Sequence, residues 1–498
     1  MEGQRLELDV ENVAHGGHCV ARHDGRVVFV RHALPGERVV ARITDGTSES
    51  KFLRADAIEI LNASPDRVTP PCPFSGPGLC GGCDWQHASL DAQRRLKADV
   101  VREQLARIAK LDVDARFPDF TVEALPGDGP IAEGLRWRTR LELAVDGGVA
   151  GLREHRSHRL VEIDDCLIAD AGFTPALHER FDAGVTGFDL VRPSVGDDII
   201  GIELPQPKGE TTPTVREVVE SAHGSAEFDV SARGFWQVHP GAAATFLDAV
   251  IDETDPQPGE SALDLYCGVG LFTRALADLV GPDGRVVGVE ADADAVDHAR
   301  TNMGGARHVD LVTSPVEKAR LPLERADVVV LDPPRAGAGR DVVATIVGLA
   351  PRVVTYVACD PAALARDLGY FASHGYELTN LRGFDAFPMT SHVECIALLE
   401  PAGEAADAEV DEDAEGQGEA EVGAQAADRG QRTGVRGDQG VHGREGTGGR
   451  DGVVQHRPAE AAGDGQDDRQ EDDQPRIEED REAEEQRGDT QGEGGALL

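Results

Sequence analysis

Between residues 262 and 358, short apolar runs of strand length alternate with longer runs that have helical spacing. The strand-like runs are 262–266, 285–290, 328–331 and 353–358, and the helix-like runs are 270–279 and 293–302. This alternation predicts parallel strands joined by crossover helices, because a tight turn cannot connect parallel neighbours. We therefore expect an α/β fold with a doubly wound, Rossmann-like sheet, which binds ligands at the carboxyl ends of its strands.

The first 60 residues have a different pattern. Runs 5–10, 26–31 and 37–43 have strand length, and Asp24-Gly25 between two such runs is a hairpin signal. This predicts a small all-β barrel that ends near Ile60.

A loop rich in Pro, Gly and Cys follows at 70–82, with too few aliphatic residues to fold alone. Ser89 is a candidate N-cap for a helix in which Leu96, Val100, Leu105 and Ile108 recur at helical spacing. Short β-type runs, such as 138–145 and 158–163, then dominate as far as residue 235. We expect a mainly-β central domain there.

Composition changes again at Pro401. From there to Leu498 the chain is mainly Gly, Ala, Gln, Asp and Glu, with few aliphatic or aromatic residues. Such a segment cannot bury enough apolar surface to offset the entropy of ordering, so we expect a disordered acidic tail. The formal net charge of −42 argues against binding to nucleic acid by bulk electrostatics, but it leaves local basic patches possible.

No run of about 18 apolar residues is present, and the N-terminus has no apolar segment of the kind found in secretory signals. We expect a cytoplasmic protein with no membrane partner, and nothing implies an obligate protein partner. In the cytoplasm the eight cysteines should stay reduced, as ligands, nucleophiles or core residues.

An apolar strand runs into a glycine turn over residues 263–270, which read Leu-Asp-Leu-Tyr-Cys-Gly-Val-Gly. Glycines there let a ligand approach the backbone closely. Glu290 ends the second strand, where a carboxylate can accept hydrogen bonds from a ribose diol. NAD is one candidate cofactor, but position 273 is Thr, so the full GxGxxG pattern is absent. The combination resembles the S-adenosylmethionine fold of class I methyltransferases more closely than a dehydrogenase.

The segment Asp332-Pro333-Pro334-Arg335 follows the strand-like run 328–331 and favours a methyltransferase. Similar motifs end in an aromatic residue in enzymes that methylate amines, where the ring stacks on a flat target. Arg335 in that place argues against simple amine methylation.

Cys359 follows the strand 353–358, at the edge where open α/β sheets bind ligands. Carbon 5 of uracil attacks a methyl donor only after a thiolate has added at carbon 6, and a base must then remove the proton on carbon 5. Cys359 is the candidate nucleophile, and Glu394 is the candidate base, because burial beside apolar neighbours would raise its pKa. Cys267 and Cys395 are rival thiols, but one lies in the glycine turn and the other in an apolar strand.

Together, these segments resemble the RNA uracil-5-methyltransferase family. The matching segments, in the family's order over about residues 1–400, are Phe235 to His239, Asp264 to Gly270, Asp332 to Arg335, Tyr356 to Pro361 with Leu364 to Asp367, and Phe387-Pro388 with His392 to Glu394. The resemblance implies that Cys359 is the nucleophile and Glu394 the proton acceptor. It also implies that the cofactor pocket contains Gln237, Tyr266, Glu290 and Asp332, with Asp332 also facing the target base.

The chain departs from the family at His239, Leu271 and Asp360, where members often have Asn. Leu271 cannot hydrogen-bond to the cofactor, and Asp360 adds a charge beside the nucleophile, with no partner evident from the sequence. The first 60 residues resemble a TRAM domain, an OB-like barrel found on RNA-modifying enzymes. Such barrels bind RNA with loops and one face, although a purely structural appendage is the alternative.

Four further cysteines form a candidate metal site: Cys72, Cys80, Cys83 and Cys166. Four thiolates can hold zinc or a 4Fe-4S cluster, but the spacing fits neither a paired zinc ribbon nor a ferredoxin run. The resemblance favours 4Fe-4S, because a subset of the family carries one on CxxxxxCxxC plus a distant cysteine; the first loop is two residues longer here. Methyl transfer needs no electrons, so we expect a structural role. Zinc and unliganded thiols are the alternatives.

We therefore predict a TRAM barrel over residues 1–60, an iron-sulfur loop, helix and central β domain over 61–235, a methyltransferase domain over 236–400 and the tail over 401–498. The expected activity is methyl transfer from S-adenosylmethionine to carbon 5 of a uridine in RNA. The barrel and the cluster favour 23S rRNA; tRNA is the alternative target. A non-catalytic RNA-binding protein on the same fold is the alternative class, and the set Cys359, Glu394 and Asp332 argues against it.

Overall fold

The computed structural model describes residues 1–403 of the 498-residue chain. The expected disorder of residues 401–498 thus concerns a segment that, from residue 404 onward, lies outside the described residues. Among residues 1–403, no helix is both long and apolar enough to cross a lipid bilayer.

A closed five-stranded barrel comes first along the chain, in the order β1-β2-β3-β5-β4. Its strands are β1 (Arg5–Val13), β2 (Cys19–His23), β3 (Arg26–Arg31), β4 (Arg38–Asp45) and β5 (Phe52–Asn62). Leu6, Leu8 and Val10 alternate along β1 and fill the barrel core. Asp24 and Gly25 both have positive φ, as a type I′ turn requires, so the predicted hairpin and barrel are confirmed.

The predicted helix is α1 (Leu90–Gln104), and the Ser89 hydroxyl caps it by accepting a hydrogen bond from the Ala92 N–H (3.3 Å). Beyond Gln104 the chain makes a π-helical turn, Leu105–Ala109. Ile108 is 37% exposed, so the prediction that it continues the apolar stripe is wrong. A short helix, α2 (Val113–Arg116), follows.

The central segment contains a five-stranded sheet, in the order β11-β10-β7-β8-β9, and a separate hairpin of β12 and β13. The bounds are β7 (Arg140–Asp146), β8 (Val149–Arg153), β9 (Leu160–Val161), β10 (Gly187–Val191), β11 (Ile200–Leu204), β12 (Thr214–Ser221) and β13 (Gly224–Ser231), with the short helix α3 (Thr174–Leu177). The mainly-β prediction is confirmed, although β9 is shorter than the predicted run.

An eight-stranded sheet follows, in the order β16-β15-β14-β17-β18-β20-β19-β6. Its strands are β14 (Ser261–Leu265), β15 (Arg285–Glu290), β16 (Val309–Thr313), β17 (Val328–Leu331), β18 (Val353–Ala358), β19 (Tyr376–Asp385), β20 (Glu394–Pro401) and β6 (Val122–Ala124). The helices are α4 (Ala242–Thr254), α5 (Leu271–Val280), α6 (Ala293–Asn302), α7 (Gly339–Gly348) and α8 (Pro361–Ser373). Strands β14 to β18 are parallel, which confirms the doubly wound fold.

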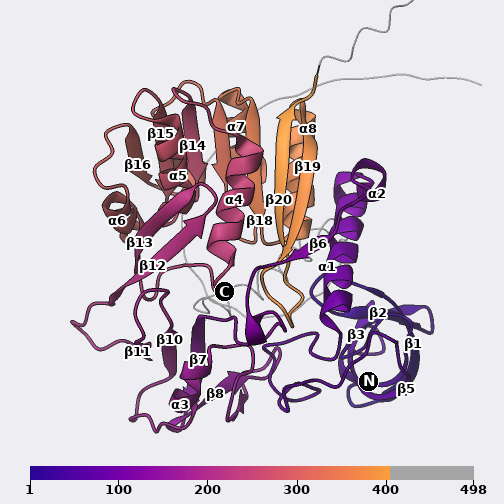
Figure 1. Ribbon diagram of the computed structural model, residues 1–498. Helices are drawn as coiled ribbons and strands as arrows, with labels where there is room; N and C mark the ends of the chain where they lie inside the picture. Colours follow the sequence, from indigo (N-terminus) through magenta and orange to yellow (C-terminus); the bar gives the residue numbers. More distant parts are fainter. Residues whose placement is uncertain (404–498) are drawn as a thin grey trace, which may run out of the picture. The chain divides into compact units, whose positions relative to one another are not determined.

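Helices cover both faces of this sheet (Figure 1). Along β17, Val328 and Val330 face the layer that contains α4 and α5, whereas Val329 and Leu331 face the layer that contains α1, α7 and α8. Because both faces are covered, the central strands are apolar at every position rather than at alternate ones.

Two features of the sheet go beyond the predicted alternation. Strand β20 inserts antiparallel between β18 and β19, and β6 joins the far edge beside β19 although it precedes the central sheet in sequence. The position of β20 brings its first residue, Glu394, to the end of β18. The geometry of the candidate site depends on this insertion.

Candidate active site

Three of the predicted cofactor residues lie at one edge of the sheet, because they end or follow adjacent strands. Strand β14 pairs in register with β15 on one side and with β17 on the other. Leu265 of β14 pairs with Val289 of β15 and with Leu331 of β17. Tyr266, Glu290 and Asp332 each directly follow one of these three residues. The chain order reverses between β14 and β17, and doubly wound sheets bind ligands at such a reversal.

The glycine turn after β14 holds Glu290 in place. The Gly268 N–H donates to Glu290 Oε2 (3.1 Å), and the N–H groups of Ala291 and Asp292 donate to Oε1 (2.6 and 2.8 Å). Tyr266 has a φ of 63°, a left-handed value that is strained for an aromatic residue and typical of functional sites. A Cβ added at Gly268 would meet no atom within 4 Å, so the turn borders open space. These features fit a nucleoside-containing cofactor.

Gln237, the fourth predicted cofactor residue, lies in the segment between β13 and α4. Trp236 and Val238 on either side of it are buried in the core, whereas Gln237 is partly exposed. Its amide makes no hydrogen bond within the part of the chain that the structure describes. Nearby Phe235 is 59% exposed. It begins the segment Phe235 to His239, and the sequence assigned it no role. The structure shows no contact that brings Gln237 to the other three residues.

Cys359 and Glu394 lie at the same end of two paired strands. Ala358 of β18 pairs with Cys395 of β20, so Cys359 and Glu394 are the neighbouring residues at this end of the strand pair. They are close enough for the charge of Glu394 to act on the Cys359 thiol. Cys359 is partly exposed and Glu394 is buried. The rival thiols of Cys267 and Cys395 are buried, so Cys359 is the accessible one of the three.

Burial and mutual repulsion raise the pKa values of the acids in this pocket. Desolvation is the largest cause of a raised pKa at Cys359, and the charges of Glu394 and Asp332 add to it. Desolvation also raises the pKa of Glu394 far above its usual range and that of Asp332 to about 7. The positive charge of Arg335 opposes the shifts at Cys359 and Glu394. The predicted burial of Glu394 is confirmed.

None of these three acidic side chains hydrogen-bonds to another residue in the described part of the chain. Buried polar groups are nearly always paired in folded proteins. Cys359, Glu394 and Asp332 are therefore available to a bound molecule. The Arg335 guanidinium lies beside them, with one nitrogen 3.2 Å from both ring nitrogens of His392.

The three departures from the family each have a local explanation. Asp360 accepts hydrogen bonds from two N–H groups at the start of α8 and pairs with His15 of the barrel (3.0 Å). Leu271, the first residue of α5, packs into the core. His239 is buried, accepts a hydrogen bond from the Gly241 N–H and stacks on Trp137. Burial lowers the pKa of His239 to about 4, so this ring is neutral.

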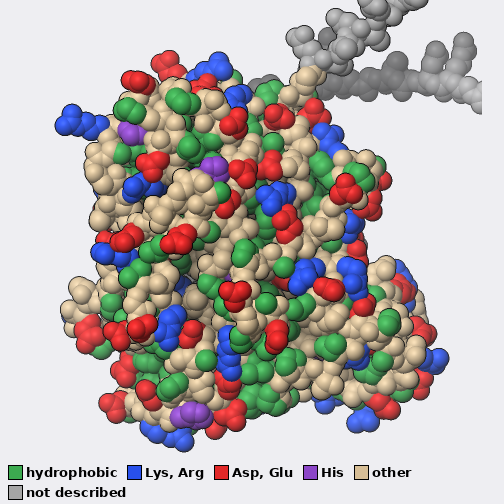
Figure 2. Space-filling model, viewed as in Figure 1, with side chains coloured by type: hydrophobic (Ala, Val, Ile, Leu, Met, Phe, Trp, Pro, Cys, Tyr) green, Lys and Arg blue, Asp and Glu red, His purple; other side chains and the backbone are tan. Residues whose placement is uncertain are grey.

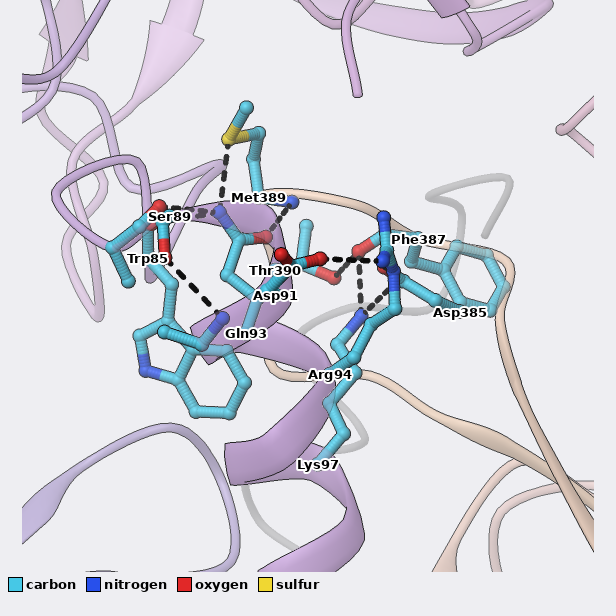
Figure 3. Close-up of polar contacts among 12 residues, drawn as sticks. Trp85, Ser89, Asp91, Gln93, Arg94, Lys97, Asp385, Phe387, Met389 and Thr390 are labelled. Carbon is cyan, nitrogen blue, oxygen red and sulfur yellow. Dashed lines mark hydrogen bonds and ion pairs between the residues drawn. The ribbon is translucent and has the colours of Figure 1, made fainter. Parts of the chain in front are cut away.

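The loop between β19 and β20 is tied to helix α1 by buried polar contacts (Figure 3). The fully buried Lys97 donates to the Asp385 carboxylate. One turn earlier on α1, the Gln93 amide oxygen accepts a hydrogen bond from the Met389 N–H (2.7 Å). Because the loop leads directly into Glu394, these contacts help to fix the position of the candidate base.

Sequence analysis gave Gln93 and Lys97 no role. Both lie on the face of α1 that also carries buried Leu96 and Val100. Two polar residues on an apolar helical face were the available signal. Their partners follow 296 and 288 residues later, which no local pattern reveals.

A second set of contacts joins the cysteine-rich loop to the loop between β19 and β20. Asp84 accepts hydrogen bonds from the backbone N–H and the hydroxyl of Ser391 (both 3.0 Å). Its other oxygen lies 3.4 Å from Arg31 of the barrel. Asp84 directly follows Cys83. The cysteine-rich segment, the barrel and the loop between β19 and β20 therefore meet at its carboxylate.

The four cysteines predicted as metal ligands lie in one region. The Cys166 thiol lies close enough to the Cys80 and Cys83 thiols to raise their pKa values. Cys72 has the same effect on Cys80. Gln86 donates to Cys83 Sγ (3.2 Å). Within residues 1–403, no group of three or more His, Cys, Asp or Glu side chains has the arrangement of a metal site. All eight cysteines are free of disulfides, as expected.

Comparisons with known proteins define the class. One family model, the TRAM domain, matches residues 1–58, and another, tRNA (uracil-5-)-methyltransferase, matches residues 211–402. The crystal structure of Pyrococcus abyssi tRNA (uracil-54, C5)-methyltransferase in complex with S-adenosyl-L-homocysteine superposes with a TM-score of 0.58 at 21% identity, covering 79% of this chain and 100% of that chain. The protein is an S-adenosylmethionine-dependent methyltransferase with an N-terminal TRAM barrel.

Relatives then identify the family. An uncharacterized RNA methyltransferase of Streptomyces avermitilis is 48% identical over 429 residues, which cover 80% of this chain and 99% of that protein. One from Streptomyces coelicolor is 49% identical over 428 residues, which cover 80% and 93%. The chain belongs to the RNA uracil-5-methyltransferase family.

The buried ion pair leads to a prediction about stability. Replacing Lys97 with Met removes the buried cation from the Asp385 carboxylate and leaves the more distant Arg94 (3.6 Å) beside it, which should lower the free energy of unfolding by about 3 kcal/mol. Urea unfolding followed by tryptophan fluorescence measures this change. The double variant Lys97→Met/Asp385→Leu removes both charges and should recover much of the loss. As a control, Lys318→Met changes a lysine that is 74% exposed and should alter stability by less than about 0.5 kcal/mol. Equal losses in the single and the double variant would contradict the prediction.

Proposed function

We propose that this enzyme methylates carbon 5 of a uridine in 23S rRNA through a covalent bond to Cys359. The observation that carries the proposal is the placement of Cys359 and Glu394 at the paired ends of β18 and β20, beside Asp332; the three side chains hydrogen-bond to no other side chain among residues 1–403. Carbon-5 methylation of a pyrimidine needs both a thiol and a base at the same ring. A non-catalytic RNA-binding protein would have no reason to keep three unpaired acids in one pocket.

Cys359 adds through its thiolate to carbon 6 of the ring, which converts carbon 5 into a nucleophile. S-adenosylmethionine, when bound, supplies an electrophilic methyl group to that carbon. Glu394 then accepts the proton from carbon 5, and Cys359 leaves as carbon 5 and carbon 6 regain their double bond. Asp332, with a pKa of about 7, can be protonated near neutrality and donate a hydrogen bond to a ring carbonyl.

For the cofactor, we propose that Glu290 binds the ribose hydroxyls and that Tyr266, Gln237 and Asp332 line the rest of the pocket. Glu290 is already held by backbone N–H groups, and the amide of Gln237 has no partner among the described residues. A fixed carboxylate costs little entropy when the ligand binds.

We further propose that Cys72, Cys80, Cys83 and Cys166 hold a 4Fe-4S cluster, with zinc as the alternative. The thiols gather in one region and receive hydrogen bonds from Gly82 and Gln86, as cluster sulfurs do. Burial lowers the pKa of nearby Arg138, and the charges of Cys166 and Cys83 oppose this shift. The cation would balance the charge of a thiolate-bound cluster. Its role would be to crosslink the cysteine-rich loop.

Two kinds of RNA are candidate substrates. The barrel together with the cysteine cluster favours 23S rRNA. The Pyrococcus abyssi enzyme acts on uracil 54 of tRNA, and the matching family model bears a tRNA name, which makes tRNA the second candidate. Figure 2 shows acidic and basic side chains interspersed on the visible face, without a broad basic area. Recognition would therefore depend on local contacts from the barrel and its neighbours rather than on bulk charge.

Substitutions of Cys359 and Glu394 should have different outcomes. Cys359→Ala should abolish both methyl transfer to RNA and the covalent adduct with 5-fluorouridine RNA, because no thiolate can add to the ring. Glu394→Gln should lower turnover by about 10²–10⁴-fold and accumulate an adduct on ordinary RNA, since addition precedes proton removal. Methylation assays and denaturing gels measure these effects. Glu400→Gln, on an exposed position of the same strand, is the matched control. Unchanged turnover in either active-site variant would refute the roles assigned.

Metal content tests the cluster. Protein purified without oxygen should be brown and contain about four irons per chain. Cys83→Ser should lose iron and colour, whereas Cys19→Ser, in the barrel core, should keep both. A colourless protein with one bound zinc would establish the zinc alternative instead.

The target can be assigned directly. Purified enzyme should form 5-methyluridine in 23S rRNA, because the barrel and the cysteine cluster are expected to recognise that substrate. Mass spectrometry of nuclease fragments measures the product in rRNA and in tRNA incubated side by side. Product confined to tRNA would favour the second candidate, and product in neither would contradict methylation of both RNAs.

A further inference from the structure

The loop between β1 and β2, residues 14–18, contacts both segments that carry the candidate catalytic residues. His15 pairs with Asp360, the residue directly after Cys359, at 3.0 Å. Two residues later, Gly17 packs so closely against Ser391 that an added Cβ would lie 2.8 Å from the Ser391 Cβ. Ser391 precedes Glu394 by three residues. The barrel therefore touches the nucleophile segment on one side of the pocket and the base segment on the other.

The loop itself is firmly seated. The Trp85 indole N–H donates to the Gly17 carbonyl oxygen (3.0 Å), and the Trp85 side chain is fully buried. Gly17 has a φ of 81°, a left-handed value that glycine adopts without strain. A side chain at this position would meet Ser391 and Asp84. His15 thus projects toward Asp360 from a fixed backbone.

Asp360 uses its two carboxylate oxygens for different purposes. One accepts hydrogen bonds from the N–H groups of Ala362 and Ala363 (3.0 and 2.8 Å) and caps α8. The other lies against the His15 ring. An Asn at this position could serve as the cap through its amide oxygen, so the cap alone does not require a carboxylate. The negative charge of Asp360, rather than its capping role, is what the contact with His15 stabilises.

That charge is unfavourable for the nucleophile. Glu394 from β20 and Asp332 from the loop after β17 already surround Cys359, and Asp360 adds a third carboxylate. Each of them raises the pKa of the Cys359 thiol, and Arg335 is the cation that opposes them. The His15 ring nitrogen lies against the outer oxygen of Asp360 and can donate a hydrogen bond to it, which offsets part of its charge. The His15 side chain is 39% exposed and that of Asp360 is 21% exposed, so solvent reaches the pair.

We propose that His15 is a positioning residue of the catalytic site, which orients Asp360 and offsets its charge so that Cys359 can ionise. The inference rests on the proposed role of Cys359 as nucleophile. It makes the barrel a structural part of the reaction site as well as an RNA-binding module.

The test is the reactivity of Cys359 in the resting, full-length holoprotein, purified without oxygen. Iodoacetamide modifies thiolates, and mass spectrometry of the peptide that contains Cys359 gives its alkylation rate at each pH. His15→Ala should slow this alkylation about threefold to tenfold near neutrality and shift its pH midpoint upward, because the partner that offsets the charge of Asp360 is lost. Asp360→Asn should alkylate at least as fast as the unchanged protein. His15→Ala should have no further effect in the Asp360→Asn background.

His23→Ala is the matched control, since His23 pairs with Asp24 on the same barrel away from the pocket. Thermal unfolding checks that each variant is folded. An unchanged rate and midpoint in His15→Ala would overturn the proposal, and so would an equal slowing in both backgrounds or a slower Asp360→Asn protein. Alkylation needs neither RNA nor methyl donor, so failure of the His15 proposal is distinguishable from failure of the proposed function. A Cys359→Ala variant that still methylates RNA would refute the proposed function itself.

Discussion

The position of the candidate base depends on one buried ion pair, between Lys97 and Asp385. Taking both charges out of water is costly, and such pairs add little net stability compared with apolar residues. Their geometry is nevertheless specific, because a buried carboxylate needs a cation close by. Arg94 of the same helix also lies near Asp385, at 3.6 Å. Asp385 ends β19 and Glu394 begins β20, so the ion pair fixes one end of the loop whose other end carries the base. A helix outside the catalytic sheet thereby helps to set the distance between Cys359 and Glu394.

The same loop explains why parts of the chain that are far apart in sequence must fold together. Asp84 holds Ser391, and Cys83, directly before Asp84, belongs to the proposed cluster. A metal group on that loop would fix Asp84 and, through it, the catalytic loop. This gives a cluster a purpose in a reaction that transfers no electrons. Arg31 and Gly17 bring the barrel to the same place. RNA bound by the barrel would therefore lie against groups that touch the reaction site.

Local sequence patterns were sufficient to predict the parallel strands, but not the long-range contacts that hold the candidate site. The predicted bounds of β15, β17, β18 and α6 agree with the structure, because each depends on a contiguous run of residues. Strand β6 has only three residues and gains its place from β19, so no pattern announces it. Cys359 and Glu394 were predicted from strand ends and motifs, and their roles stay predictions. The pairs Lys97 with Asp385 and His15 with Asp360 were not, since each joins residues about 290 or more positions apart in sequence.

The pocket contains more acidic groups than it can ionise at once. Burial raises the pKa of Cys359, Glu394 and Asp332, and Arg335 is the nearby cation, so the pocket disfavours more than one negative charge at a time. In the proposed reaction this charge first resides on sulfur and then, after addition, on the ring oxygen. Methyl transfer neutralises it. Glu394 loses its own proton to solvent only after that, when the ring no longer carries the charge, and it then accepts the proton from carbon 5. The raised pKa that keeps Glu394 protonated beside the thiolate therefore suits a mechanism that uses one negative charge at a time.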